Sequence, residues 1–162
     1  PQAVKMLAPQ LAARLKIYQQ CREGDEAAIE AAYQGSGCGL EVRHFFGNMN
    51  ELYGKIHLMV SRAGASSVSE IAVAGIPSIL VPLPIAADDH QTYNAKEIGE
   101  AGAGIVLNQA DFTAQKLKEI LEDLATHQQK LKQMSDNAKK VGIKDAAKRF
   151  ADAIEKEIIA KH

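Results

Sequence analysis

Several features that would point to a particular class of protein are absent from this sequence. It has only two cysteines, Cys21 and Cys38, which form no CxxC pair. We therefore expect no disulfide framework, and a reducing compartment fits best. No apolar run approaches the roughly 20 residues that a membrane-spanning helix needs, and no signal peptide opens the chain. The formal net charge of −1 gives no electrostatic reason to expect a nucleic-acid partner.

Familiar catalytic and cofactor motifs are missing as well. The five histidines lack the spacing of a ligand set, so we expect no metal site and no cofactor. The sequence contains no G-x-S-x-G elbow, no Walker loop and no G-x-G-x-x-G motif. Asp88 and Asp89 are adjacent, whereas the two carboxyl groups of a glycosidase must face each other across the scissile bond. That spacing argues against a paired-carboxylate hydrolase built on Asp88 and Asp89.

What the sequence does contain is an alternation of strand-like and helix-like segments. The chain has 162 residues, 46% hydrophobic and 24% charged, which suits one globular domain. Strands are predicted at 15–19, 40–46, 56–61, 78–82 and 102–107. Helices are predicted at 3–15 with an interruption at Pro9, and at 25–34, 49–53, 66–74, 91–101, 113–125, 127–140 and 145–160. This order predicts an α/β fold, a parallel sheet with helices on both faces, whose ligands bind at the carboxyl ends of the strands.

The strongest local signal lies in residues 58–82, LMVSRAGASSVSEIAVAGIPSILVP. Gly64 permits a tight turn and the close approach of a ligand, and a helix follows it. Ser66 or Ser67 is expected to cap this helix, and Ser67 with Glu70 has the S-x-x-E spacing of a capping box. The free amides of a helix N-terminus suit a phosphate or diphosphate, and Glu70 could accept ribose hydroxyls. The alternative is that a helix simply begins here.

Polar side chains crowd a second segment, residues 82–102. Asp89 is expected to cap a helix through the helix dipole. His90 and Gln91 offer hydrogen-bonding groups, and the amide of Gln91, which both donates and accepts, suits sugar hydroxyls. We expect Asn94 to bond backbone and hold the loop.

Two aromatic residues end a predicted strand in a third segment, residues 42–53 (VRHFFGNMNELY). For Phe45 we favour a position in the core. For Phe46, the backbone N–H and C=O could pair with the edge of a pyrimidine, and a core position is the alternative.

Residues 61–95, SRAGASSVSEIAVAGIPSILVPLPIAADDHQTYNA, are very similar to the C-terminal-domain signature of the MurG-type transferases, which add N-acetylglucosamine to lipid I. The resemblance runs from Pro1 to the C-terminus and is tightest over 42–110. It implies a Rossmann-like domain, the C-terminal half of a GT-B glycosyltransferase, with residues 1–162 forming one donor-binding domain that ends in helices over about 113–160.

The resemblance also implies roles for matching residues. The uracil of UDP-N-acetylglucosamine would meet the backbone of Phe46, with Met49 lining the pocket. Glu70 would hold the ribose, the turn before it would follow the diphosphate, and Gln91 with His90 would reach the N-acetylglucosamine. Arg62 would shape the loop. The substrate-binding residues expected are Phe46, Met49, Arg62, Gly64, Ala65, Ser66, Ser67, Val68, Ser69, Glu70, His90 and Gln91.

Members of this family are longer, and the resemblance places their acceptor site, their membrane contact and their proposed catalytic base in another domain. We therefore expect a fragment that binds donor, contains no catalytic residue and is inactive alone. The whole enzyme would be an inverting transferase on the cytoplasmic face of the bacterial inner membrane. The first strand of the domain is expected to be missing, which would expose two strand edges. Another GT-B transferase, a UDP-sugar epimerase and a non-catalytic nucleotide-binding module are the alternatives.

Overall fold

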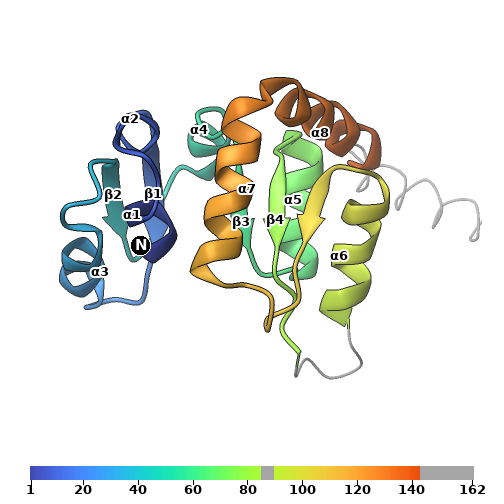
Figure 1. Cartoon of the computed structure of the whole chain (residues 1–162). Helices are drawn as coiled ribbons and strands as arrows, with labels where there is room; N and C mark the ends of the chain where they lie inside the picture. The colour runs from blue at the N-terminus through green and yellow to red at the C-terminus, as the bar shows by residue number, and fades with distance from the viewer. Residues whose placement is uncertain (85–89, 143–162) are drawn as a thin grey trace, which may run out of the picture.

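The computed structural model describes residues 1–84 and 90–142, in which helices and parallel strands alternate (Figure 1). In chain order the elements are α1 (Gln2–Lys5), α2 (Pro9–Ala12), β1 (Lys16–Gln20), α3 (Glu26–Tyr33), β2 (Gly39–Arg43), α4 (Met49–Tyr53), β3 (Met59–Ser61), α5 (Ala65–Ala74), β4 (Ser78–Leu80), α6 (His90–Glu100), β5 (Gly104–Val106), α7 (Ala114–Thr126) and α8 (Gln128–Val141).

Each element corresponds to a segment predicted from the sequence pattern. Pro9 is the first residue of α2, so the first helical segment is split into two helices, as the interruption in the pattern indicates. The strands predicted at 56–61, 78–82 and 102–107 are shorter in the structure, because only three residue pairs on each side of β4 form the ladder. The helix predicted at 145–160 and the cap expected at Asp89 lie outside the described residues.

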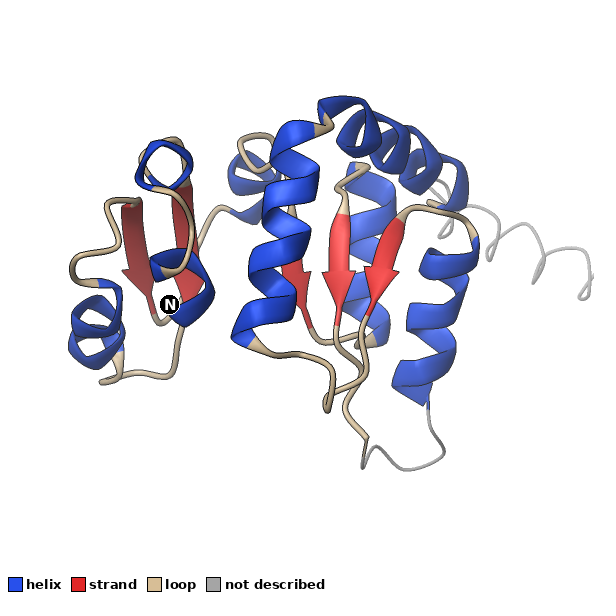
Figure 2. Ribbon diagram, in the orientation of Figure 1, coloured by secondary structure: helices blue, strands red, loops and turns tan. Residues whose placement is uncertain are grey.

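The central sheet has the strand order β3-β4-β5, and all of its strands run parallel. Figure 2 shows their arrows pointing the same way, so the carboxyl ends meet at one edge. The middle strand is fully buried, and its side chains alternate between two apolar layers. Ile79 packs in the cluster that contains Leu124 of α7, whereas Leu80 packs in the cluster that contains Ile71 of α5 and Ile98 of α6.

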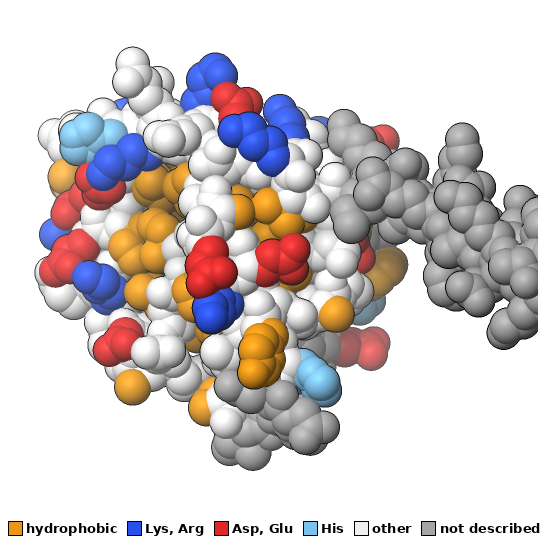
Figure 3. Space-filling view, turned by 90° about the vertical axis from the view of Figure 1, so that its right-hand side faces the viewer, with side chains coloured by type: hydrophobic (Ala, Val, Ile, Leu, Met, Phe, Trp, Pro, Cys, Tyr) orange, Lys and Arg blue, Asp and Glu red, His pale blue; other side chains and the backbone are white. Residues whose placement is uncertain are grey.

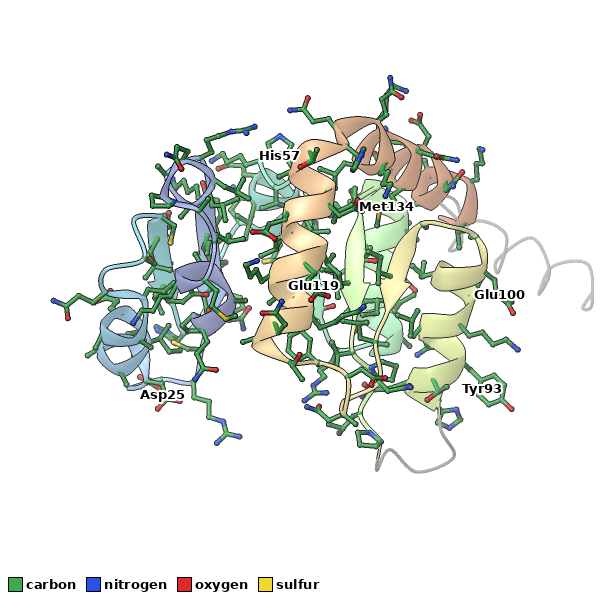
Figure 4. All side chains as sticks on the ribbon, viewed as in Figure 1. Asp25, His57, Tyr93, Glu100, Glu119 and Met134 are labelled. Carbon is green, nitrogen blue, oxygen red and sulfur yellow. The ribbon has the colours of Figure 1, made fainter. Side chains whose placement is uncertain are left out.

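Helices cover both faces of this sheet, as the fold prediction requires. Figure 1 shows α7 on one side and α5 on the other. Helix α8 contributes to both apolar layers, because Met134, labelled in Figure 4, packs with the α7 layer and Ala138 packs with the α5 layer. Close packing holds α6 to the sheet: a Cβ on Gly104 would lie 2.7 Å from the Cγ2 of Ile98 and 2.6 Å from the Oγ of Ser78.

A second, smaller sheet is formed by β1 and β2, which pair in parallel from Lys16↔Gly39 to Gln20↔Arg43. It has its own apolar cluster, which includes Val4 of α1 and Tyr33 of α3, and Leu121 of α7 packs against this cluster. No ladder joins β1 to β3 within the described residues. The described strands therefore form two separate sheets, and β1 and β3 are each a terminal strand of their own sheet.

The described residues include no candidate membrane span, and the face drawn in Figure 3 carries charges of both signs. Within residues 1–84 and 90–142, no helix is both long enough and apolar enough to cross a membrane. Figure 3 shows acidic and basic side chains interspersed among apolar ones on the visible face. Ligands of parallel α/β sheets bind at the carboxyl ends of the strands, so the loops after β3, β4 and β5 are the candidate positions for a site.

Candidate functional site at the carboxyl edge of the central sheet

The turn between β3 and α5 leaves backbone amides at the start of a ten-residue helix. Gly64 is the N-cap residue, and the first helical hydrogen bond runs from the N–H of Val68 to the C=O of Gly64 at 2.9 Å. The amides of Ala65, Ser66 and Ser67 precede that bond, so the helix itself provides no acceptor for them. They point out of the positive end of the helix dipole, an arrangement that attracts anions.

The capping predictions for this helix were wrong. Helix α5 begins at Ala65, one residue earlier than predicted, so Ser66 and Ser67 lie within its first turn instead of at its N-cap position. No side chain caps the helix. Glu70, the expected partner of Ser67 in a capping box, accepts a hydrogen bond from another helix instead.

The conformation of Gly64 argues against one of the two roles predicted for it, the tight turn. Its backbone has φ −63° and ψ 147°, an extended conformation that any residue adopts, so the turn does not require glycine. A Cβ at this position would meet nothing closer than the Oγ of Ser67 at 4.0 Å. Neither backbone strain nor packing therefore explains the glycine, whereas the close approach of a ligand would.

The side chains after the turn separate into anchoring and exposed groups. Val68 is buried in the apolar layer beneath the helix, and its amide closes the first turn. Ala65, Ser66, Ser69 and Glu70 are exposed. The turn is therefore open to solvent, and α5 is held in place by the core below it.

Glu70 is held by Tyr53, a residue that the sequence analysis did not select. The phenol hydroxyl of Tyr53, the last residue of α4, donates to Oε2 of Glu70 at 2.5 Å. The ring of Tyr53 is half-buried and packs against the same apolar layer as Val68. A sequence signal did exist, since Tyr53 follows Met49 by four residues and lies on the same face of a helix. The partner of that face could not be inferred from the sequence.

Burial and the contact with Glu70 together raise the pKa of Tyr53 to about 12. Burial of the ring is the largest cause, followed by the hydrogen bond to Glu70 and the charge of its carboxylate. A raised pKa favours the protonated phenol in the folded domain over the unfolded chain, where it titrates near about 10. The contribution of this group to stability is therefore complete below pH of about 10 and is lost as the pH rises through about 12.

We expect Glu70→Gln to lower the pKa of Tyr53 without returning it to the ordinary value, because burial remains while the charge of the carboxylate is lost. The chain has four tyrosines and no tryptophan, so tyrosinate absorbance can be followed during an alkaline titration. Subtracting the titration of Tyr53→Phe isolates the contribution of Tyr53. An identical titration of Tyr53 in the parent and Glu70→Gln chains would contradict the coupling.

Arg62 connects the ends of all three strands of the central sheet. It follows β3, and its Nη1 donates to the C=O of Val81, just after β4, at 3.3 Å. The same nitrogen donates to Oε1 of Gln109, after β5, at 2.5 Å. The prediction that Arg62 shapes the loop is confirmed, and Gln109 is a partner that the sequence analysis missed.

The first turns of α6 hold two neighbouring loops. Nδ2 of Asn94 donates to the C=O of Ala63 at 3.0 Å, which confirms its predicted role of bonding loop backbone. Oε1 of Gln91 accepts from the N–H of Leu83, after β4, at 3.0 Å. His90 begins α6 and is exposed. The expectation that Gln91 and His90 reach a sugar stays a prediction, and one oxygen of Gln91 already supports a loop.

The segment after β2 forms a separate cluster. The prediction that Phe45 is a core residue was wrong, because its side chain is 64% exposed. Strand β2 ends at Arg43, so strand alternation does not extend to the two phenylalanines. Phe46 takes the packed position instead: its ring lies edge-on to Tyr18 with centroids 6.3 Å apart, and 5.9 Å from the guanidinium carbon of Arg43.

A cavity of about 260 Å³ adjoins this cluster, between the β1–β2 sheet and α4. Its lining includes Phe46, Asn48 and Leu52 but none of residues 62–70. Met49, at the start of α4, is half-buried. Helix α4 thus begins with Met49, close in sequence to Phe46, and ends with Tyr53, which bonds Glu70 of α5. It therefore connects the Phe46 segment to α5.

Among the described residues, no group of three or more His, Cys, Asp or Glu side chains is placed to hold a metal ion. The polar groups at this edge include the backbone amides at the start of α5, the carboxylate of Glu70, the guanidinium of Arg62 and the side-chain amides of Gln91 and Asn94. Such a set suits a ligand with an anionic part and several hydroxyls.

The parallel order, the helices on both faces and the open helix N-terminus after β3 define a doubly wound α/β domain of the nucleotide-binding type. The model of the glycosyltransferase family 28 C-terminal domain matches residues 1–150. The chain belongs to that family.

Similar proteins support the same assignment over nearly the whole chain. A protein of Gluconobacter oxydans named UDP-N-acetylglucosamine--N-acetylmuramyl-(pentapeptide) pyrophosphoryl-undecaprenol N-acetylglucosamine transferase is 42% identical over 155 residues, covering 96% of this chain and 42% of that protein. A relative of the same name from Rhodospirillum rubrum is 42% identical, covering 95% of this chain and 40% of its own length. The crystal structure of Acinetobacter baumannii MurG superposes with a TM-score of 0.81 at 32% identity, covering 96% of this chain and 46% of that one. The chain spans less than half the length of these relatives.

Proposed function

We propose that residues 1–162 form the donor-binding domain of a glycosyltransferase that takes N-acetylglucosamine from its uridine diphosphate ester. The relatives named above support the identity of the donor. The observation that carries the proposal for this chain is the pairing of two features. The free amides of Ala65, Ser66 and Ser67 lie at the solvent-exposed start of α5, and the carboxylate of Glu70 is held in place one turn further on.

In this arrangement the diphosphate lies against the start of α5, from Gly64 to Ser67, where it needs no metal ion to neutralise it. Glu70 accepts the two ribose hydroxyls. The uracil meets the backbone of Phe46, and Met49 lines that side of the pocket. Gln91 and His90 reach the sugar. Arg62 and Asn94 do not need to touch the donor, because they fix the loops that surround it.

The proposed reaction of the whole protein is an inverting transfer. The 4-hydroxyl of N-acetylmuramic acid in lipid I attacks the anomeric carbon, the bond from that carbon to the diphosphate breaks, and the proton of the hydroxyl passes to a base. UDP leaves, and the product is lipid II of peptidoglycan synthesis. Negative charge grows on the departing diphosphate, so amides already oriented at the start of α5 stabilise the transition state more than the ground state.

The acceptor, the base and any membrane contact belong in this proposal to the larger part of the relatives' length, which this chain does not span. The whole protein would work as a peripheral enzyme on the cytoplasmic face of the inner membrane, where lipid I is exposed to a soluble donor.

Isothermal titration of the chain with UDP and UDP-N-acetylglucosamine tests the proposal. Saturable binding of both is expected, with ADP much weaker because a purine does not fit a pocket built around the uracil edge. Failure to bind either uridine compound, or equal binding of ADP, would contradict it. Titration with and without EDTA checks that no divalent cation is required.

A further inference from the structure

We infer that Tyr53 is a positioning residue, which fixes the carboxylate of Glu70 so that its remaining acceptor sites face the ribose of the donor. This inference rests on the proposed function and assigns to α4 a part in recognising the sugar of the nucleotide. It concerns a residue that makes no contact with the ligand itself.

The first reason is that Glu70 needs an external support. It lies on the exposed side of α5, and a glutamate side chain at such a position samples several rotamers whose loss on binding opposes association. The bond from Tyr53 at 2.5 Å selects one of these rotamers before the ligand arrives.

The second reason is that Tyr53 is itself well anchored. Its ring packs against the apolar layer formed by residues such as Val68 and Ile71 of α5. The packing of its ring therefore fixes the position of the Tyr53 hydroxyl. The ring and helix α5, which carries Glu70, pack in the same apolar layer. A serine or threonine in α4 would be too short to bridge two helices in this way.

The third reason is the chemistry of the donor group. A phenol is neutral and donates one hydrogen bond, so it occupies one acceptor site on Oε2 and leaves Oε1 with its lone pairs for the ligand. A lysine or arginine at position 53 would also attract the diphosphate and compete for it. A neutral donor orients the carboxylate without creating a second anion site.

The consequence is specific to ribose. If Tyr53 orients Glu70, then losing the phenol hydroxyl weakens the recognition of the 2′- and 3′-hydroxyls more than the recognition of the base and phosphates. The ratio of the dissociation constants for 2′-deoxy-UDP and UDP measures this effect. A general loosening of the fold would weaken both ligands alike and leave the ratio unchanged.

The test is Tyr53→Phe, which removes one oxygen atom and retains the ring. We expect UDP to bind about tenfold more weakly, since the loss of a hydrogen bond to a charged group reduces affinity by roughly that factor. We also expect the ratio of the dissociation constants for 2′-deoxy-UDP and UDP to fall toward the ratio of Glu70→Ala. In the Glu70→Ala background, Tyr53→Phe should have no further effect on UDP affinity. Tyr33→Phe is the matched control, because the Tyr33 hydroxyl donates to Oε1 of Gln19 at 2.8 Å, outside the proposed site; both its UDP affinity and its ratio should match the parent.

The outcomes separate this inference from the proposed function. If the parent chain does not bind UDP, the proposed function itself fails. If the parent binds UDP and Glu70→Ala binds it more weakly, while Tyr53→Phe matches the parent in affinity and ratio, the inference alone is overturned. Equal weakening of UDP and 2′-deoxy-UDP in Tyr53→Phe would also overturn it. If Tyr53→Phe does not fold, a crystal structure of the parent with UDP tests the inference. The hydrogen bond from Tyr53 to Glu70 should be retained beside the ribose, and its absence would show that the inference is wrong.

Discussion

Glu70→Ala is expected to weaken the binding of UDP to this chain by about a hundredfold, which corresponds to about 2.7 kcal/mol. Hydrogen bonds to a carboxylate contribute about 1.5–3 kcal/mol each, and two ribose hydroxyls lose their acceptor in the variant. Removing the charge of Glu70 also relieves its repulsion of the diphosphate. That gain is about 1 kcal/mol or less at a solvated site, so the lost hydrogen bonds dominate.

The control for this prediction is Glu100→Ala, which makes the same change in net charge. Glu100 is the last residue of α6, whereas His90 and Gln91 begin that helix. Glu100 is exposed and forms an ion pair with Lys96 at 3.6 Å, and Figure 4 shows it on the outer side of the molecule. UDP affinity should be unchanged in this variant. Isothermal titration of both variants and the parent is the measurement, and equal affinity of Glu70→Ala and the parent would remove the basis for placing a ribose at α5.

Ile98→Ala is expected to lower the free energy of unfolding by about 3 kcal/mol, the middle of the range for emptying a fully buried isoleucine site. Ile98 is fully buried in α6 and belongs to the apolar layer that also holds Val68 and Ile71 of α5. For a domain of this size, the loss corresponds to a fall in Tm of roughly 6–12 °C. The same substitution should weaken UDP binding only slightly, since no atom of Ile98 reaches the surface.

Val73→Ala provides the comparison on the exposed side of α5. Val73 is 40% exposed, and alanine has the higher helix propensity, so the stability should change by no more than about 0.5 kcal/mol. Chemical denaturation of both variants measures the difference. Similar losses in the two would mean that the layer beneath α5 is not the core that supports the site.

The sequence pattern was sufficient to predict the helices and strands, but it was not sufficient to predict the contacts between them. The short run of β4, buried throughout and apolar at Ile79 and Leu80, and the Gly75 stop after α5 are local signals. A strand covered on both faces favours apolar residues, and Gly75 ends the helix at φ 70°. The segment of Phe45 was misread because the strand pattern appeared to continue beyond Arg43. The position of one strand end decided which of two aromatic rings is packed.

The support of the site depends on contacts between residues far apart in the chain. Tyr53 and Glu70 are separated by 17 positions, and Arg62 and Gln109 by 47. No periodicity encodes such pairs, because each depends on how two elements come together after they have formed. Glu70 and the turn at Gly64 could be selected from the sequence, whereas the residues that hold them could not.

The division between β1–β2 and β3–β4–β5 has a mechanical consequence. Backbone hydrogen bonds resist separation within each set of strands, but no such bond crosses from one set to the other among the described residues. Side-chain packing such as that of Leu121 and the peptide segment leading into α4 connect the two sets. A force that pulls α1 away from α7 would thus separate the two sets of strands by unpacking apolar side chains. The backbone hydrogen bonds within both sheets would remain intact.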